Sequence, residues 1–183
     1  MEYSMEWRRF SMVKTITLAE NKPYPNNELP VLIYEDVLND ALNQDYSAED
    51  VLNLFENNGY DRGWISVIAD EHHFHSNAHE ALAVTRGEVT VLLGGQNGEI
   101  TTLRKGDVIL LPAGTAHKRL DGSNDFQIAG AYPSNGDDFD MQYGNASDYE
   151  QIKENISNVG RPLTDPVTGD PGDMEEYWSK QYI

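Results

Sequence analysis

The sequence contains no cysteine among its 183 residues. This absence excludes disulfide bonds, thiolate nucleophiles and sulfur-ligated metals, so nitrogen and oxygen atoms must bind any metal ion. Basic residues are also scarce: 13 Lys and Arg stand against 31 Asp and Glu, giving a net charge of −18. Such a field repels nucleic acids and anionic membrane surfaces. We therefore expect no nucleic acid and no membrane as partner, but a small-molecule ligand, since a buried cation can reverse the potential inside a pocket.

Long apolar runs are missing as well. Residues 1–13 carry charged side chains where a secretory signal needs an apolar stretch, and no later run approaches membrane-spanning length. These features predict a cytoplasmic protein. Met12 is a possible start of the protein, and residues 1–11 before it are then predicted to be a disordered extension or the result of a mis-assigned start. The length that remains, 12–183, is suited to one domain.

Short strands dominate the predicted secondary structure. Between residues 62 and 133, β-branched and aromatic residues alternate with turns built on Gly, Asn and Asp. The absence of crossover helices favours an all-β sandwich or jelly-roll barrel over a parallel α/β sheet. The strands that we expect span 15–18, 29–35, 63–69, 74–75, 80–86, 89–93, 100–104, 108–111, 117–119 and 126–132.

Helices are expected only at the periphery. Ser47 is a good N-cap, Asp50 follows three positions later, and an apolar stripe over 51–55 completes the pattern of a capped helix. A second helix is expected over 149–156, followed by a Pro- and Gly-rich segment, 161–173, that should wrap the surface or be partly mobile. The single domain then comprises a barrel core at about 63–133, N-terminal strands and a helix in 13–60, and a C-terminal wrap in 148–183.

The spacing of the histidines points to a metal site. In a strand, residues i and i+2 face the same side, so His73 and His75 project together. Glu80 lies five positions after His75, so in an unbroken strand the two side chains would point to opposite faces. The segment 76–78 is turn-prone, however, and lets a new strand begin with Glu80 pointing inward.

A separate segment supplies the fourth candidate ligand. Val108 to Leu111 form a buried strand, and Pro112 with Gly114 forces a bend that can present His117 to the centre. Three imidazoles and one carboxylate suit one divalent transition metal ion: Mn, Fe, Co, Ni, Cu or Zn. One or two coordination positions would remain for water or substrate.

Two motifs carry a resemblance to a known family. The patterns His73-x-His75-(x4)-Glu80-(x6)-Gly87 and Gly106-(x5)-Pro112-x-Gly114-(x2)-His117 resemble the two motifs of the cupin superfamily. Asp121 stands where the second motif often ends in Asn, and Val67 stands where the first often opens with Gly. Further stretches, such as Gly130-Ala-Tyr-Pro133, resemble a bacterial branch of YjlB-like proteins. The resemblance implies a double-stranded β-helix, the RmlC-like jelly roll, with the metal ion inside it.

For several other residues, a structural or solvated position is the simpler interpretation. His79 and His72 have the opposite parity to the ligands, which favours a surface or subunit-contact position for both. Trp64 is expected in the core. The acidic run at 136–140 lacks the ordered spacing of a calcium loop and is expected to be a solvated turn. Four residues could line the pocket, although solvated positions are the commoner fate of Lys and Arg: Arg62, Arg86, Lys118 and Tyr132.

The sequence supports two main functional hypotheses. The first is a metal-dependent enzyme of oxygenase or isomerase type that acts on a small polar metabolite. The second is a non-catalytic binding or sensing module with a structural metal, and a weaker third is a barrel that acts mainly by protein contact. Fold cannot choose among these chemistries, and no catalytic residue is assigned. A homodimer is expected, because edge strands need cover and residues 13–35 could add a strand to a neighbouring subunit.

Overall fold

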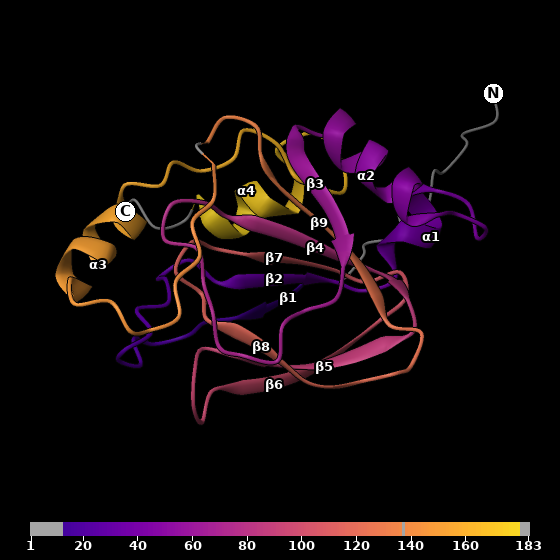
Figure 1. Ribbon diagram of the computed structural model, residues 1–183. Coiled ribbons are helices and arrows are strands. Elements are labelled where there is room, and N and C mark those ends of the chain that lie inside the picture. The colour runs from indigo at the N-terminus through magenta and orange to yellow at the C-terminus, as the bar shows by residue number, and fades with distance from the viewer. Residues whose placement is uncertain (1–12, 137, 180–183) are drawn as a thin grey trace.

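Two antiparallel β-sheets face each other in the computed structural model, which describes residues 13–136 and 138–179 (Figure 1). The expected disordered extension, 1–11, lies outside the described residues. The larger sheet contains, in spatial order, β1 (Val13–Ile16), β2 (Val31–Tyr34), β7 (Val108–Leu111), β4 (Glu80–Arg86), β9 (Gln127–Pro133) and β3 (Tyr60–Ser66). The smaller sheet contains β6 (Glu99–Arg104), β5 (Glu88–Leu93) and β8 (His117–Gly122). This mostly β architecture with few helices confirms the predicted fold class.

Alternation along the central strands divides the interior into two apolar layers. In β7, Ile109 and Leu111 belong to the cluster between the two sheets, whereas Val108 and Leu110 belong to a cluster on the other face of the larger sheet. Both layers are built from buried hydrophobic side chains, which explains why β7 is buried at every position. The metal site predicted from the sequence lies on the face of β4 that looks between the sheets.

Helices cover the outer face of the larger sheet. The capped helix predicted at Ser47 is present as α2 (Ala48–Asn57), with Ser47 and Asp50 forming a reciprocal capping box. Val51 and Phe55 of this helix are fully buried against the sheet. Figure 1 shows α4 (Gly172–Trp178) over the same sheet, and α3 (Tyr149–Ser157) at one end of the barrel, where Ile152 and Ile156 pack against Phe74.

The sequence prediction missed two helices and misplaced one strand. The helix α1 (Val37–Ala41) is short, and α4 (Gly172–Trp178) begins inside the segment expected only to wrap the surface. The predicted strand at 74–75 is replaced by two isolated antiparallel bridges, from His73 to His117 and from Phe74 to Gln142. In the described part of the chain, no helix is long and apolar enough to cross a membrane.

A buried aspartate anchors the C-terminal segment to the sheet. Asp165 is 0% exposed, and its carboxylate accepts four hydrogen bonds. One oxygen accepts from the backbone N–H groups of Val167 and Thr168, at 2.8 and 3.2 Å. The other accepts from the Tyr34 hydroxyl at 2.7 Å and from the backbone N–H of Met174 at 3.2 Å. The carboxylate therefore joins β2 to the start of α4.

This anchor generates a stability prediction. Asp165→Asn should lower the free energy of unfolding by about 2–4 kcal/mol, because the new amide NH₂ would face N–H and O–H donors in a buried site. Urea unfolding followed by circular dichroism measures the change. Asp45→Asn, the same chemical change at an exposed position, is the control and should have little effect. Equal effects of the two substitutions would contradict the anchoring role.

Candidate metal centre

Glu80 is the first residue of β4 and forms the floor of the candidate site. It pairs with Leu111 of β7 and shares the inward face of its strand with Leu82 and Val84. Its side chain is only 3% exposed. The sequence prediction that a new strand begins with Glu80 pointing inward is therefore confirmed. A carboxylate so deeply buried needs a cation or several hydrogen-bond donors beside it.

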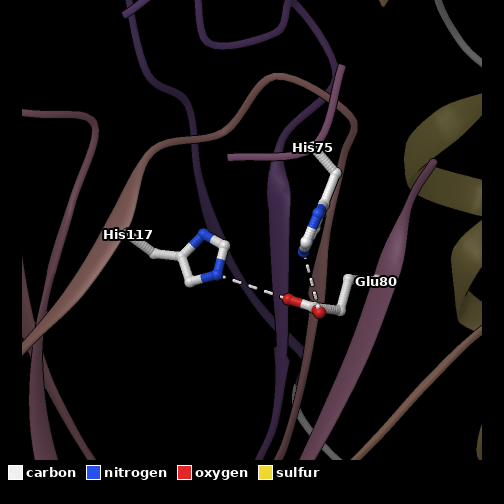
Figure 2. A group of neighbouring side chains, drawn as sticks. All are labelled: His75, Glu80 and His117. Atoms are coloured by element: carbon white, nitrogen blue, oxygen red, sulfur yellow. Dashed lines mark hydrogen bonds and ion pairs between the residues drawn. The ribbon is translucent and has the colours of Figure 1, made fainter. Parts of the chain in front are cut away.

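Two imidazoles lie beside the Glu80 carboxylate. The Nε2 atom of His75 lies 3.0 Å from one Glu80 carboxylate oxygen, and the Nε2 atom of His117 lies 3.3 Å from the other. Figure 2 shows both rings directing this nitrogen at the carboxylate from separate segments of the chain. One ligand atom from each of the three residues falls within 4.8 Å of the others, and all three side chains are buried.

The other ring nitrogen of each imidazole is already committed. Nδ1 of His75 lies 2.5 Å from the backbone carbonyl of Asp140, and Nδ1 of His117 lies 2.9 Å from that of Thr115. Since a carbonyl oxygen only accepts, each Nδ1 must carry the proton and donate it. In the neutral ring, Nε2 is then a bare lone pair. Metal-bound histidines are typically held in this way by their second nitrogen.

Lone pairs on Nε2 that face carboxylate oxygens repel unless a positive charge lies between them. One solution is a second proton on the imidazole, and the other is a metal ion coordinated by all three side chains. The Glu80 oxygen nearest His117, Oε1, is buried without a hydrogen-bond partner in the described structure. A buried carboxylate oxygen without a partner needs a cation or a donor beside it. Together with the two imidazoles, it forms a set of donor atoms that suits a metal ion.

The electrostatics of the cluster follow from its burial. Burial alone would raise the pKa of Glu80, but His75 and His117 outweigh it and hold the pKa well below its usual value. Burial has the opposite effect on an imidazole and would lower the pKa of His75, yet the adjacent Glu80 carboxylate raises this pKa overall. Glu80 is therefore ionised and available as a ligand at neutral pH.

His73, the fourth predicted ligand, lies next to this group but outside the 4.8 Å cluster. Its ring centroid is 4.1 Å from that of His117 and 6.2 Å from that of His75, and all three rings line one cavity. Its Nδ1 lies 2.9 Å from the backbone carbonyl of Glu71, which again leaves Nε2 free. Burial, followed by the neighbouring His117, lowers the pKa of His73 to about 4, so the ring is neutral at neutral pH.

Backbone hydrogen bonds fix the two ligand segments to each other. His73 and His117 exchange both hydrogen bonds of an antiparallel bridge, at 3.2 and 3.0 Å, and the N–H of Gly114 donates to the carbonyl of His75 at 2.7 Å. Gly114 has φ +85°, and a Cβ there would lie 2.7 Å from the backbone oxygen of Asn26. Only glycine allows this bend. The predicted role of the segment before His117 is therefore confirmed.

A second group of side chains holds the carboxylate from the barrel wall. The Tyr132 hydroxyl donates to Glu80 Oε2 at 2.7 Å and accepts from the indole N–H of Trp64 at 3.0 Å. Burial, followed by the Glu80 charge, raises the pKa of Tyr132. Arg62 lies over the Tyr132 ring at 5.7 Å and donates to the carbonyl of Pro133. Tyr132, Arg62 and Trp64 all line the cavity. Trp64 also packs against the apolar cluster between the sheets, in agreement with its predicted core position, whereas Arg62 takes the pocket position instead of the commoner solvated one.

The acidic run at 136–140 is only partly the solvated turn that the sequence predicts, because Asp138 is 95% exposed whereas Asp140 is bound into the site. Asp140 accepts hydrogen bonds from the backbone N–H and the hydroxyl of Ser76, at 2.7 and 2.5 Å, in addition to holding His75 with its carbonyl. These bonds fasten 138–142 across the ligand-bearing segment. Phe139 and Met141 are thereby placed on the cavity wall. No sequence spacing links Asp140 to His75, 65 positions away, so sequence reasoning had no signal for this contact.

The prediction for His79 was wrong. His79 is 1% exposed, accepts a hydrogen bond from the backbone N–H of Ala113 on Nδ1 and donates from Nε2 to the carbonyl of Gly160. Burial lowers its pKa to about 4. Strand parity correctly predicted that the ring points away from the site. That face of the sheet is covered by α4, however, and the ring centroids of His79 and Trp178 are 5.0 Å apart. His79 is thus a structural link between loops.

The remaining candidates lie away from the metal cavity. His72 is half-buried and lines a different cavity together with Lys118. Arg86 is exposed at the far end of β4 and is not among the residues that line the site. The metal cavity has a volume of about 360 Å³. A larger cavity of about 880 Å³, between residues 17–29 and α3, has no histidine in its lining.

Comparisons with known proteins agree with this geometry. A family model described as "Cupin domain" matches residues 67–120. The chain is 33% identical over 168 residues to "Uncharacterized protein YjlB" of Bacillus subtilis (strain 168), covering 91% of this chain and 97% of that protein.

Similar solved structures include the WlaRB TDP-quinovose 3,4-ketoisomerase from Campylobacter jejuni, with a TM-score of 0.39 and 16% identity over 51% of this chain and 75% of that one. The coconut allergen cocosin has a TM-score of 0.35 and 23% identity over 46% of this chain, which spans about a fifth (21%) of cocosin's length. On the cupin-domain match and the nearly full-length relative, the chain belongs to the cupin superfamily, in the branch of YjlB-like proteins.

Proposed function

We propose that the protein binds one divalent transition metal ion through His73, His75, Glu80 and His117. The observation that carries this proposal is the shared state of the three imidazoles. Each donates Nδ1–H to a backbone carbonyl and so keeps Nε2 free as a ligand atom. Two of these Nε2 atoms face a buried, ionised carboxylate. Mn, Fe, Co, Ni, Cu and Zn all accept such a ligand set.

We further propose that the protein is a metal-dependent enzyme acting on a small molecule. The cavity of about 360 Å³ gives a ligand direct access to the predicted metal position. A bound ion would supply Lewis acidity, or redox chemistry if it is Fe, Mn or Cu. The chain's own residues would orient the ligand against the apolar walls, exclude water and hold Glu80 in place through the Tyr132 hydroxyl.

Within the enzyme class, the lining favours oxygenase-type chemistry over proton-transfer isomerisation. Among the described residues that line the cavity, the ionisable groups outside the ligand set are Arg62 and Tyr132. A guanidinium does not deprotonate near neutral pH, and burial raises the pKa of Tyr132 away from it. General-base catalysis needs a group whose pKa lies near the working pH. Neither residue meets that requirement.

The lack of a suitable acid–base group in the described lining also supports a second candidate, a non-catalytic binding or sensing module with a structural metal. A cavity of this kind can retain a ligand without transforming it. The two candidates differ in whether the ion keeps a coordination position open to exogenous ligands.

We also propose that the protein is a homodimer in the cytoplasm. The dimer is supported by β1, an edge strand of the larger sheet that a second subunit can cover.

The ligand set predicts a pattern of metal loss. Single replacement of His73, His75 or His117 by Ala, or of Glu80 by Gln, should weaken metal binding by about 100-fold or more, since each change removes a direct ligand. Competition with a chromophoric chelator measures the affinity, and elemental analysis gives the stoichiometry of protein purified without added metal. His72→Ala is the matched control and should retain one equivalent. Full metal binding by the His73 variant would reduce the set to three ligands.

Azide binding distinguishes an open metal site from a closed one. In the cobalt-loaded protein, azide should change the visible absorption spectrum, because an enzyme site leaves a coordination position for an exogenous ligand. Metal-free protein and the Glu80→Gln variant, treated in the same way, report any effect that does not involve the ion. A spectrum that stays constant up to high azide concentration would favour the structural-metal module over the enzyme.

A further inference from the structure

We propose that the cavity takes a small, flat and largely apolar molecule that carries a single ionised oxygen, and that it excludes phosphorylated or multiply charged metabolites. The inference rests on the proposed metal centre, which would receive that oxygen. The sequence predicts a small polar metabolite as ligand. This inference replaces that description with a molecule that has an apolar body and one polar end. Three features of the cavity support it: the composition of its walls, its charge and its size.

The walls of the cavity are largely apolar. Beyond the proposed ligands, the lining consists mainly of hydrophobic side chains: Trp64, Val67, Ile68, Leu82, Phe139 and Met141. Val67, Phe139 and Met141 stay 44%, 37% and 43% exposed. Single exposed apolar residues are ordinary, but three gathered around one cavity above a polar floor form a binding surface for an apolar ligand.

Two parallel aromatic rings form part of this wall. The Phe139 ring stacks on Tyr132 with centroids 4.2 Å apart and an interplanar angle of 16°, and it meets the edge of His75 at 5.3 Å. Tyr132 is held in turn by its hydrogen bonds to Glu80 and Trp64. The Tyr132 ring is therefore held in one orientation, and Phe139 packs on it and on His75. A planar ligand gains more from such a surface than a puckered sugar does.

The charge of the cavity suits one oxyanion. Arg62 is the single Lys or Arg among the described lining residues, and its Nε donates to Asp61 at 2.9 Å while Nη1 lies 3.7 Å from Asp138. These carboxylates offset its charge. A divalent ion with Glu80 leaves one net positive charge, which one ionised oxygen balances. A phosphate ester brings a second negative charge into a protein whose net charge is −18.

The size of the cavity limits the ligand as well. Ligand pockets span about 300–1,000 Å³. At about 360 Å³, this cavity is near the lower limit and leaves little space for a nucleotide or an oligosaccharide. A single-ring compound with a phenolate or enolate oxygen matches the apolar walls, the single charge and the volume together.

The test compares three probes on the metal-loaded protein: 4-nitrophenol, azide and glucose 6-phosphate. 4-Nitrophenol is a flat ring with one oxygen, which ionises near neutral pH, and its visible absorption reports binding of that oxygen to a metal. Azide contacts only the ion, and the sugar phosphate is polar and doubly charged. We expect 4-nitrophenol to bind at least about tenfold more tightly than glucose 6-phosphate. Phe139→Ala should weaken 4-nitrophenol binding about five- to tenfold, through lost stacking and apolar contact, and leave azide binding unchanged.

Two further variants make the result specific. Tyr143→Ala removes an exposed aromatic ring four positions along the chain, outside the cavity lining, and should change neither probe. Phe139→Leu keeps an apolar wall without the ring and should give an intermediate affinity. Two results would overturn this inference alone: protein that binds metal and azide but prefers glucose 6-phosphate, or a 4-nitrophenol affinity that does not change in the Phe139 variants. Protein that binds no metal would overturn the proposed function as well.

Discussion

The buried carboxylate of Glu80 is the constraint that the rest of the site satisfies. Removing such a charge from water costs several kcal/mol, which nearby positive charge and hydrogen bonds must offset. Tyr132 provides one hydrogen bond, and His75 and His117 provide the nearest nitrogens. Because backbone carbonyls fix the proton of each ring on Nδ1, the nitrogens that face Glu80 are free to coordinate. Without a metal ion, a second proton on His75 can offset the Glu80 charge, because Glu80 raises the pKa of that imidazole despite its burial. With a metal ion, the same nitrogens can coordinate it.

The fold keeps this arrangement rigid with few elements. β4 lies between β7 and β9 near the middle of the larger sheet, so Glu80 at its start cannot shift without disturbing two ladders of hydrogen bonds. The two histidine segments are joined to each other by the bridge between His73 and His117. The segment 138–142 then fastens His75 from outside the barrel. Metal sites need this kind of support, because small displacements of a ligand weaken coordination.

Local sequence rules predicted the parts of the site that depend on the backbone alone. The inward row that begins at Glu80 followed from strand parity, and the bend before His117 followed from Pro112 and Gly114. Long-range packing decided the rest. Parity placed His79 on the opposite face but could not show that α4 covers it. The contact of Asp140 with His75 and that of Tyr132 with Glu80 join residues 65 and 52 positions apart, and neither spacing carries a signal in the sequence.

The position of His73 connects the ligand set to the type of reaction. Its neutral ring has one free nitrogen, Nε2, which can serve as a metal ligand or as a general base but not as both at once. A base must accept a proton, and the resulting imidazolium would lie within a few ångströms of His117, next to a divalent cation. Repulsion between those charges opposes protonation, whereas coordination removes it. His73 is therefore better suited to bind an ion than to move protons. Under the proposed function, the chemistry of this cavity depends on that ion and on how the apolar walls orient its ligand.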